Sequence, residues 1–224
     1  CPPARRTVML MGQSVTKNAL LLALFAMSTA LLLAGSYLLT KDRIAGEIRK
    51  AEEKALLQIV PRERHDNSML DDTVIVGPEA AALGLRTEKQ IYRARQGERI
   101  VAAIIPATAR DGYSGDIDLV IGVNADGTVA GVRTLSHKET PGLGDKVDLA
   151  KSDWILGFTG RSLDNPLPDQ WAVTKDKGVF DSFTGATITP RAVVATVRGV
   201  LEYAGENSEA LFGKPAAGNA GGAQ

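Results

Sequence analysis

The sequence predicts an α+β protein, in which one N-terminal transmembrane helix precedes a domain built from an antiparallel sheet and packed helices. Residues 18–40 contain no charged side chain. Residues 117–133 alternate between apolar and polar types around a turn, which is typical of a β-hairpin. Apolar residues recur at helical spacing after Pro190. The 224 residues suffice for an anchor and one domain with its own core.

The composition excludes several function classes. Lys and Arg together number 26, as do Asp and Glu, so no net positive charge favours nucleic acid as a partner. Cys1 is the single cysteine, which excludes an internal disulfide, a cysteine-based zinc site and an iron–sulfur cluster. His65 and His137 lie far apart in the sequence, and we expect no metal site.

The charge-free stretch has the length and composition of a membrane span. Of the 21 residues in 19–39, 17 are apolar, and a helix of that length covers about 30 Å, the thickness of a hydrocarbon core. The alternatives are a buried core helix and a cleaved signal peptide, but Ala34-Gly35-Ser36 is a poor cleavage site. We therefore predict a retained anchor at 18–40 after an N-terminal tail at 1–17. Basic residues lie on both sides of the span, so charge does not decide its orientation.

A stalk and a connector are expected next. Apolar residues recur three or four positions apart from 41 to 60, which predicts an amphipathic helix that continues the anchor over 41–61 and ends at Pro61. Ile44, Ile48 and Ala51 belong to its apolar stripe. Residues 62–72 form a polar connector, and we expect His65 there to be a surface residue without a role.

The predicted sheet covers residues 74–136. Residues 90–95 and 99–105 are expected as two strands joined at Gly97, and residues 117–123 and 129–133 as two strands joined by Asn124-Ala125-Asp126-Gly127. Residues 150–156 are expected to form a short helix. Trp154 and Trp171 are expected in the core or a lid rather than in electron transfer.

Residues 181–190 combine hydroxyls and small residues with a helix start. The stretch is Asp181-Ser182-Phe183-Thr184-Gly185-Ala186-Thr187-Ile188-Thr189-Pro190. Thr189 is predicted as the N-cap and Pro190 as the first helical residue. The apolar face of the helix comprises Val193, Val194, Val197, Val200 and Leu201. Because a helix start stabilises an anion, the pattern favours a phosphate, although an ordinary loop that caps a helix would have the same spacing.

A second loop rich in glycine and proline follows the hairpin. It is Lys138-Glu139-Thr140-Pro141-Gly142-Leu143-Gly144, and an ordinary turn would have a similar composition. It is not a phosphate-binding P-loop, because Asp145 stands where that motif requires lysine.

Together these motifs resemble the FMN-binding domain family shared by G subunits of Rnf-type electron transport complexes and C subunits of sodium-translocating NADH:quinone reductases. The matching residues are the Asp-x-x-Thr-Gly-Ala-Thr run at 181–187, Gly-Tyr-Ser-Gly at 112–115 and the loop at 138–144. The resemblance implies FMN bound covalently through a phosphoester to Thr187. The other cofactor-binding residues that it implies are Asp181, Ser182, Thr184, Gly185, Ala186, Glu139, Thr140, Pro141, Gly142 and Leu143. The FMN-binding domain would occupy residues 62–205, before a flexible tail at 206–224.

The resemblance also implies a function. It favours the G-type member of the family, because the chain is short and has few insertions between the anchor and the flavin motif. Such a protein relays electrons through FMN in a complex that couples ferredoxin/NAD electron transfer to ion translocation, and it is not catalytic alone. The expected partners are other membrane and redox subunits, a flavin transferase and the lipid bilayer. The expected location is the inner membrane, with the FMN domain on the periplasmic side. A flavin-binding sensor module and a structural subunit with an empty site are the alternatives.

Overall fold

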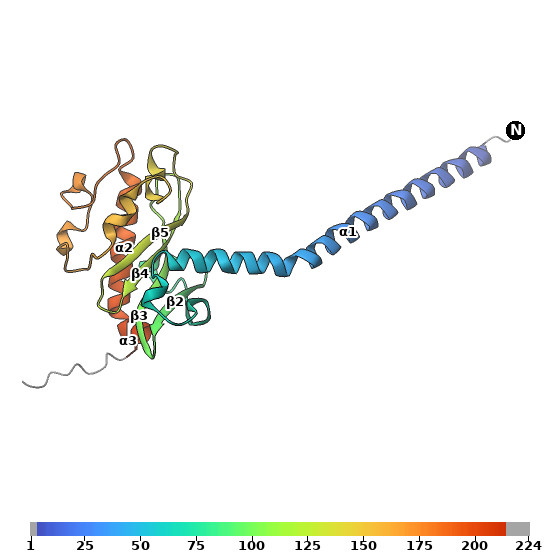
Figure 1. The fold of residues 1–224 in the computed structure, drawn as a ribbon. Coiled ribbons are helices and arrows are strands. Elements are labelled where there is room, and N and C mark those ends of the chain that lie inside the picture. The colour runs from blue at the N-terminus through green and yellow to red at the C-terminus, as the bar shows by residue number, and fades with distance from the viewer. Residues whose placement is uncertain (1–3, 214–224) are drawn as a thin grey trace, which may run out of the picture. The chain divides into compact units, whose positions relative to one another are not determined.

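The structure is a computed structural model that describes residues 4–213, without the side chains of 4–16 and of several positions between 42 and 52. The chain divides between Glu52 and Glu53 into two compact units. A long helix, α1 (Ala4–Leu57), precedes a five-stranded sheet, and the helices α2 (Ile188–Glu206) and α3 (Ser208–Phe212) follow it (Figure 1). The predicted α+β class is confirmed.

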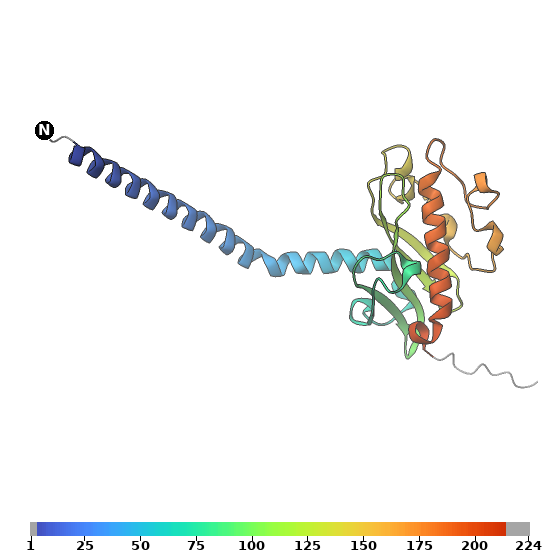
Figure 2. The same ribbon diagram turned by 180° about the vertical axis from the view of Figure 1, so that it is seen from behind.

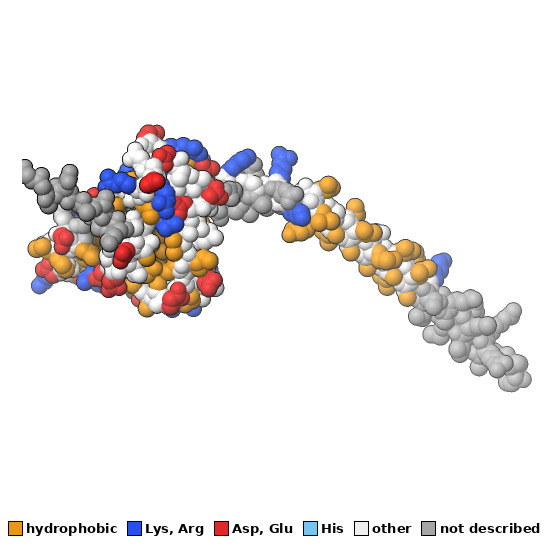
Figure 3. All heavy atoms as spheres, turned by 90° about the horizontal axis from the view of Figure 1, so that it is seen from below, with side chains coloured by type: hydrophobic (Ala, Val, Ile, Leu, Met, Phe, Trp, Pro, Cys, Tyr) orange, Lys and Arg blue, Asp and Glu red, His pale blue; other side chains and the backbone are white. Residues whose placement is uncertain are grey.

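Helix α1 contains the expected apolar span. Its segment Lys17–Lys41 has a mean hydropathy of 2.1 and is long and apolar enough to cross a membrane. Hydrophobic side chains cover the visible face of this segment in Figure 3. The helix ends at Leu57, four residues before Pro61, and the backbone N–H groups of Ile59 and Val60 still bond to the carbonyl of Leu56. The side chains of Ile44, Ile48 and Ala51 lie outside the described residues.

The sheet is an antiparallel meander. Its strands are β1 (Thr73–Val76), β2 (Lys89–Gln96), β3 (Arg99–Ala109), β4 (Ile117–Asn124) and β5 (Val129–Ser136), and they neighbour one another in chain order. Both predicted hairpins are present, and Val123 pairs with Val129 across the second one. Gly127 in the second turn has a φ of 82°, which glycine adopts without steric cost because it has no Cβ atom. Strand β3 extends four residues beyond its predicted end.

Helix α2 covers one face of the sheet (Figure 2). The five residues of its predicted apolar face are all buried. They pack in one core with alternate residues of the central strands, among them Ile105, Ala107, Leu119 and Ile121. The helical and strand periodicities therefore meet in a single apolar layer.

A second, smaller core lies on the opposite face of the sheet. Leu56, Ile59, Val60 and Met69 pack against sheet residues Ala94, Ala102, Ile104 and Val120. The end of the predicted stalk and the predicted connector thus belong to the domain. His65 is half-buried rather than a surface residue, because this segment lies against the sheet.

Ile59 lies over a pair of glycines. Gly122 of β4 and Gly131 of β5 are paired in the register. A Cβ atom built on Gly122 would lie 2.3 Å from Ile59 Cγ2, and one on Gly131 would lie 3.5 Å from it. The two missing side chains leave the space into which Ile59 packs.

The C-terminal part differs from the expected elements in two places. The predicted helix at 150–156 is a 3-10 helix, η5 (Asp153–Phe158), which begins later because the side chain of Ser152 caps the N–H of Trp154. The fold continues past residue 205, since α3 buries Leu211 against the core. Residues 214–224, the rest of the expected tail, lie outside the described part of the chain. Trp171 is buried in the core, and Trp154 packs against it partly buried.

Candidate functional site

The loop at residues 181–187 is anchored by Phe183. This ring is buried and lies edge-on to Trp154, with 5.0 Å between ring centroids. Trp154 Nε1 also donates to the carbonyl oxygen of Asp181 at 2.9 Å. Gly185 has a φ of 82°, and the N–H of Ala186 donates to the carbonyl of Phe183 at 3.1 Å. These contacts hold a tight turn in front of α2.

The predicted cap of α2 is wrong. The helix begins at Ile188, with Thr187 at the N-cap position, so Pro190 is its third residue. Thr189 is fully buried, and its Oγ1 donates to Glu139 Oε2 instead of capping the helix. The side chain of Thr187 makes no capping hydrogen bond, which leaves its hydroxyl directed to other partners.

The Thr187 hydroxyl accepts a hydrogen bond from a lysine that lies outside the predicted site. Lys175 Nζ donates to Thr187 Oγ1 at 2.7 Å. Lys175 lies in a 3-10 turn, η7 (Thr174–Asp176), and its side chain is exposed. No sequence pattern indicated this contact, because a lysine twelve positions upstream has the appearance of an ordinary surface residue.

Glu139 ties the 112–115 loop and its own loop, 138–144, to the start of α2. Its side chain is only 4% exposed. Its Oε1 accepts a hydrogen bond of 2.9 Å from the N–H of Ser114, and its Oε2 accepts the hydroxyl of Thr189. One carboxylate thus joins residues of three segments that are distant in sequence.

The rest of the second loop is a compact turn. The carbonyl of Thr140 accepts the N–H groups of Leu143 and Gly144, both at 3.1 Å. Gly142 has a φ of 78°, and its N–H donates to Asp145 Oδ1 at 2.8 Å. Leu143 remains 42% exposed, and its Cδ2 lies 3.5 Å from the position of a Cβ atom on Gly185. The two loops are therefore in contact.

A cavity of about 150 Å³ lies between the loops. It is lined by Tyr113, Glu139, Thr140, Leu143, Gly144, Gly185 and Ala186. The structure thus brings together five of the residues singled out from sequence. A larger cavity of about 240 Å³, lined by residues such as Asp126, Ser162 and Phe212, contains none of them.

The other predicted site residues lie around this cavity rather than in its lining. The side chains of Asp181 and Thr184 are exposed, and Ser182 Oγ lies 3.5 Å from Thr174 Oγ1. Pro141 and Gly142 are exposed in the turn of the second loop. Thr187 is half-buried beside the cavity-lining Ala186.

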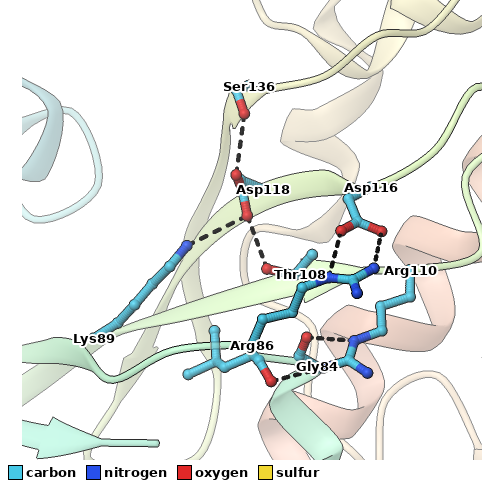
Figure 4. A network of polar contacts seen from close by, with 9 residues as sticks. Gly84, Arg86, Lys89, Thr108, Arg110, Asp116, Asp118 and Ser136 are labelled. Carbon is cyan, nitrogen blue, oxygen red and sulfur yellow. Dashed lines mark hydrogen bonds and ion pairs between the residues drawn. The ribbon is translucent and has the colours of Figure 1, made fainter. Parts of the chain in front are cut away.

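A polar network holds the strand ends from which the 112–115 and 138–144 loops leave the sheet (Figure 4). Asp118 accepts hydrogen bonds from Lys89 Nζ at 3.3 Å, Thr108 Oγ1 at 2.8 Å and Ser136 Oγ at 3.1 Å. Burial raises the pKa of Asp118, but the Thr108 hydrogen bond and the charge of Lys89 outweigh it and leave that pKa lowered. Because Ser136 directly precedes the 137–144 loop, the network fixes the base of that loop.

A second ion pair stands at the base of the 112–115 loop. Arg86 Nε donates to Asp116 Oδ2 at 2.9 Å, and this hydrogen bond lowers the pKa of the Asp116 carboxyl. Arg110 donates to the carbonyls of Gly84 and Leu85, both at 2.7 Å. Both loops therefore start from braced strand ends.

Comparison with known proteins agrees with this arrangement. The family profile described as FMN-binding domain matches residues 112–202, which include both motif loops, and the profile described as RnfG N-terminal region matches residues 9–59. The fold and the matched region define a protein with an FMN-binding domain behind an N-terminal helix.

Curated relatives identify the family. The G subunit of the ion-translocating oxidoreductase complex of Pseudoalteromonas atlantica is 48% identical over 202 residues, which cover 90% of this chain and 94% of that protein. The protein of the same name from Pseudomonas aeruginosa is 47% identical over 201 residues, covering 89% and 93%. The chain belongs to the family of Rnf-type complex G subunits. Among solved structures, the chain is similar to the crystal structure of Shewanella oneidensis NqrC. The comparison has a TM-score of 0.43 at 21% identity and covers 62% of this chain and 67% of that one.

Proposed function

We propose that this chain carries FMN on Thr187 through a phosphoester and relays electrons in a membrane complex that couples ferredoxin/NAD electron transfer to ion translocation. One observation carries the proposal: the loops at 138–144 and 181–187 line a single cavity, and Thr187, which directly follows the cavity-lining Ala186, has a hydroxyl that makes no capping bond. The names of the relatives, which are subunits of ion-translocating oxidoreductase complexes, support the same role.

The residues of this site fit a flavin phosphate. Thr187 precedes a helix of 19 residues, whose unpaired N–H groups and partial positive charge favour an anion there. Gly185 and Ala186 carry no bulky side chain that would keep a ligand from the backbone. The ammonium of Lys175 adds a positive charge at the hydroxyl itself.

The size of the cavity suits a relay. Pockets that enclose a whole ligand usually measure roughly 300–1,000 Å³, and this one has about 150 Å³. A flavin ring placed here would be covered only in part, with Leu143 and Tyr113 as exposed neighbours. When bound, FMN supplies one- and two-electron chemistry, while the chain supplies position and surroundings. Glu139 would hold the 112–115 loop and the start of α2 against its own loop beside the flavin.

The proposal extends to the location and maturation of the chain. The segment Lys17–Lys41 would span the lipid bilayer of the inner membrane once, with the FMN domain on the periplasmic side, beside other membrane and redox subunits. A separate flavin transferase would attach the cofactor. The exposure of Asp181 and Thr184 supports their recognition by such an enzyme.

The relay is tested in membranes from the native host. Flavin absorbance is followed during NADH-driven turnover in the wild type, in Thr187→Ala and in the matched control Thr159→Ala, which removes an exposed threonine side chain outside the motif loops. We expect a flavin signal that is reduced and reoxidised in the wild type and in the control, and that is absent in Thr187→Ala. A bound flavin that stays oxidised during turnover would favour the sensor module, and a wild type without flavin would favour the structural subunit.

The role of Asp181 is tested separately. Asp181→Asn should slow covalent loading by the transferase while flavin already attached stays in place, since the side chain points to solvent. Loading is measured as the flavin fraction on the Thr187 peptide over time. A loading rate equal to that of the wild type would contradict a role of Asp181 in recognition by the transferase.

A further inference from the structure

We propose that Lys175 is a positioning residue whose ammonium group is the counter-ion of the phosphate on Thr187. This inference rests on the covalent attachment proposed above and adds a residue outside both motif loops. The hydrogen bond of 2.7 Å between Lys175 Nζ and Thr187 Oγ1 is its starting point. Many exposed lysines lie near a hydroxyl by chance, but the fold holds Lys175 in this position through its backbone and through a neighbouring ion pair.

The backbone that carries Lys175 is rigid. Val173 and Phe180 are buried on either side of the turn, and the N–H of Thr174 donates to the carbonyl of Phe180 at 2.7 Å. The N–H of Gly178 donates to the carbonyl of Val173 at 3.0 Å. A Cβ atom on Gly178 would lie 1.9 Å from the carbonyl oxygen of Ala172, so this close crossing needs glycine. The lysine is therefore presented from a closed, well-supported turn.

An ion pair clamps the same turn to α2. Arg191 donates to both carboxylate oxygens of Asp176, at 2.6 and 2.8 Å. The hydrogen bond from Arg191 lowers the pKa of the Asp176 carboxyl, which keeps the pair charged. Because Arg191 lies one helical turn after Thr187, the clamp sets the position of η7 beside the threonine. Asp176 forms its hydrogen bonds with Arg191 and also feels the charge of Lys175, while the ammonium of Lys175 donates its hydrogen bond to the Thr187 hydroxyl.

A neutral hydroxyl does not need a cation, but a phosphodiester does. A phosphodiester on Thr187 would place a negative charge where the ammonium already lies, and charge-assisted hydrogen bonds are stronger than those to neutral groups. Lysine has three donors on a flexible stem, so it can bond a phosphate oxygen without movement of the backbone. The start of α2 would add its own positive end to the same phosphate.

The test uses the full-length chain, loaded by its native transferase, with Lys175→Met, Lys175→Arg and Lys177→Met compared with the wild type. Lys177 is exposed two residues away, so its variant removes the same charge from the same turn. The ³¹P resonance of the attached phosphate is recorded in each loaded protein, and the loading rate is measured by mass mapping of the Thr187 peptide.

We expect the ³¹P resonance to be displaced in Lys175→Met and unchanged in Lys177→Met, and loading to slow about tenfold in Lys175→Met alone, with Lys175→Arg close to the wild type. An unchanged resonance in Lys175→Met would overturn the inference, even if loading were slower. If Lys175→Met does not fold, Lys175→Gln serves the same comparison, since it keeps a donor but no charge. A wild type that carries no flavin on Thr187 would instead refute the attachment itself, and with it this inference.

Discussion

Glu139 is the residue on which the geometry of the site depends most. Its buried carboxylate accepts hydrogen bonds from Ser114 and Thr189, and both donors would lose their partner if the carboxylate were removed. Its position in the loop was evident from the sequence, but its partners were not. They come from segments 25 and 50 residues away.

Truncation of this side chain should therefore cost stability. We expect Glu139→Ala to lower the free energy of unfolding by about 2 kcal/mol, because the buried Thr189 hydroxyl and the Ser114 N–H lose their acceptor. Glu139→Gln keeps an acceptor of the same size and should retain most of the stability. Urea unfolding of the two variants and the wild type measures the difference. Equal stability of Glu139→Ala and the wild type would contradict the bracing role of Glu139.

The start of α2 shows what could be predicted at the scale of one residue and what could not. A hydroxyl before proline is a sound sequence signal for an N-cap, yet Thr189 bonds to Glu139 and the helix starts earlier. The competing acceptor is distant in sequence, so local capping rules do not include it. For the same reason, no local pattern indicated the contact of Lys175 with Thr187.

At the scale of elements, the start of β1 is tied to β2 by a carboxylate. Asp72 accepts hydrogen bonds from Arg93 and Arg95, and its side chain is 16% exposed. Burial raises the pKa of Asp72, but the hydrogen bonds from Arg95 and Arg93 outweigh it, so its pKa lies below the ordinary 3.8. A carboxyl whose pKa is lowered by folding stabilises the fold above pH 3.8, and this stabilisation is lost as the pH falls through the folded-state pKa.

This linkage predicts a pH-dependent effect. Asp72→Asn should lower the free energy of unfolding by about 2 kcal/mol at pH 7, since hydrogen bonds to charged groups contribute about that much. The difference from the wild type should shrink as the pH falls below 3.8. Denaturant unfolding across pH measures it, with the exposed Asp169→Asn as a control. A difference that stays constant with pH would contradict the assignment.

Ile59 and Gly122 couple the segment after α1 to the sheet. Gly122→Ala would place a methyl group 2.3 Å from Ile59 Cγ2, so we expect a loss of roughly 1–3 kcal/mol from overpacking. Ile59→Ala should also destabilise, by roughly 2–5 kcal/mol through loss of a buried side chain. The double variant should cost less than the sum, because the shorter side chain makes room for the methyl group. Additive losses in chemical unfolding would argue against this packing.

The strands and α2 were predictable because each shows its own periodicity in the sequence. The second core was not, because residues 59–70 have no regular apolar repeat. These residues cover the face of the sheet opposite α2, and the sequence does not show which face α2 covers. In the sequence, Gly122 and Gly131 indicate two positions without side chains, but they do not indicate that Ile59 fills the space.

At the scale of the whole molecule, the chain consists of an apolar helix and a domain that holds both cores. The buried core residues among the described positions start at Leu56, after the boundary between the two units. We therefore expect a chain that starts at Glu53 to fold alone and to leave the membrane fraction. Circular dichroism with thermal melting and membrane fractionation check this. Loss of cooperative melting would show that the domain needs the preceding helix.

Family membership was evident from the sequence, because the two motif loops were complete, and the relatives confirm it. The cavity between these loops was not predictable, because it depends on how a loop after β5 meets a loop before α2. That meeting is set by the sheet order and by the hydrogen bond from Thr189, at the start of α2, to Glu139.

The most direct test of covalent attachment is mass mapping of the Thr187 peptide from protein purified from its native host. We predict that this peptide carries the mass of FMN less one water, and that the denatured band fluoresces under ultraviolet light. Thr187→Ala should have neither signal but the same melting temperature, since the substitution removes a hydroxyl that caps nothing. An unmodified Thr187 peptide in a dark band would contradict the flavin relay and leave residues 181–187 as an ordinary turn before a helix.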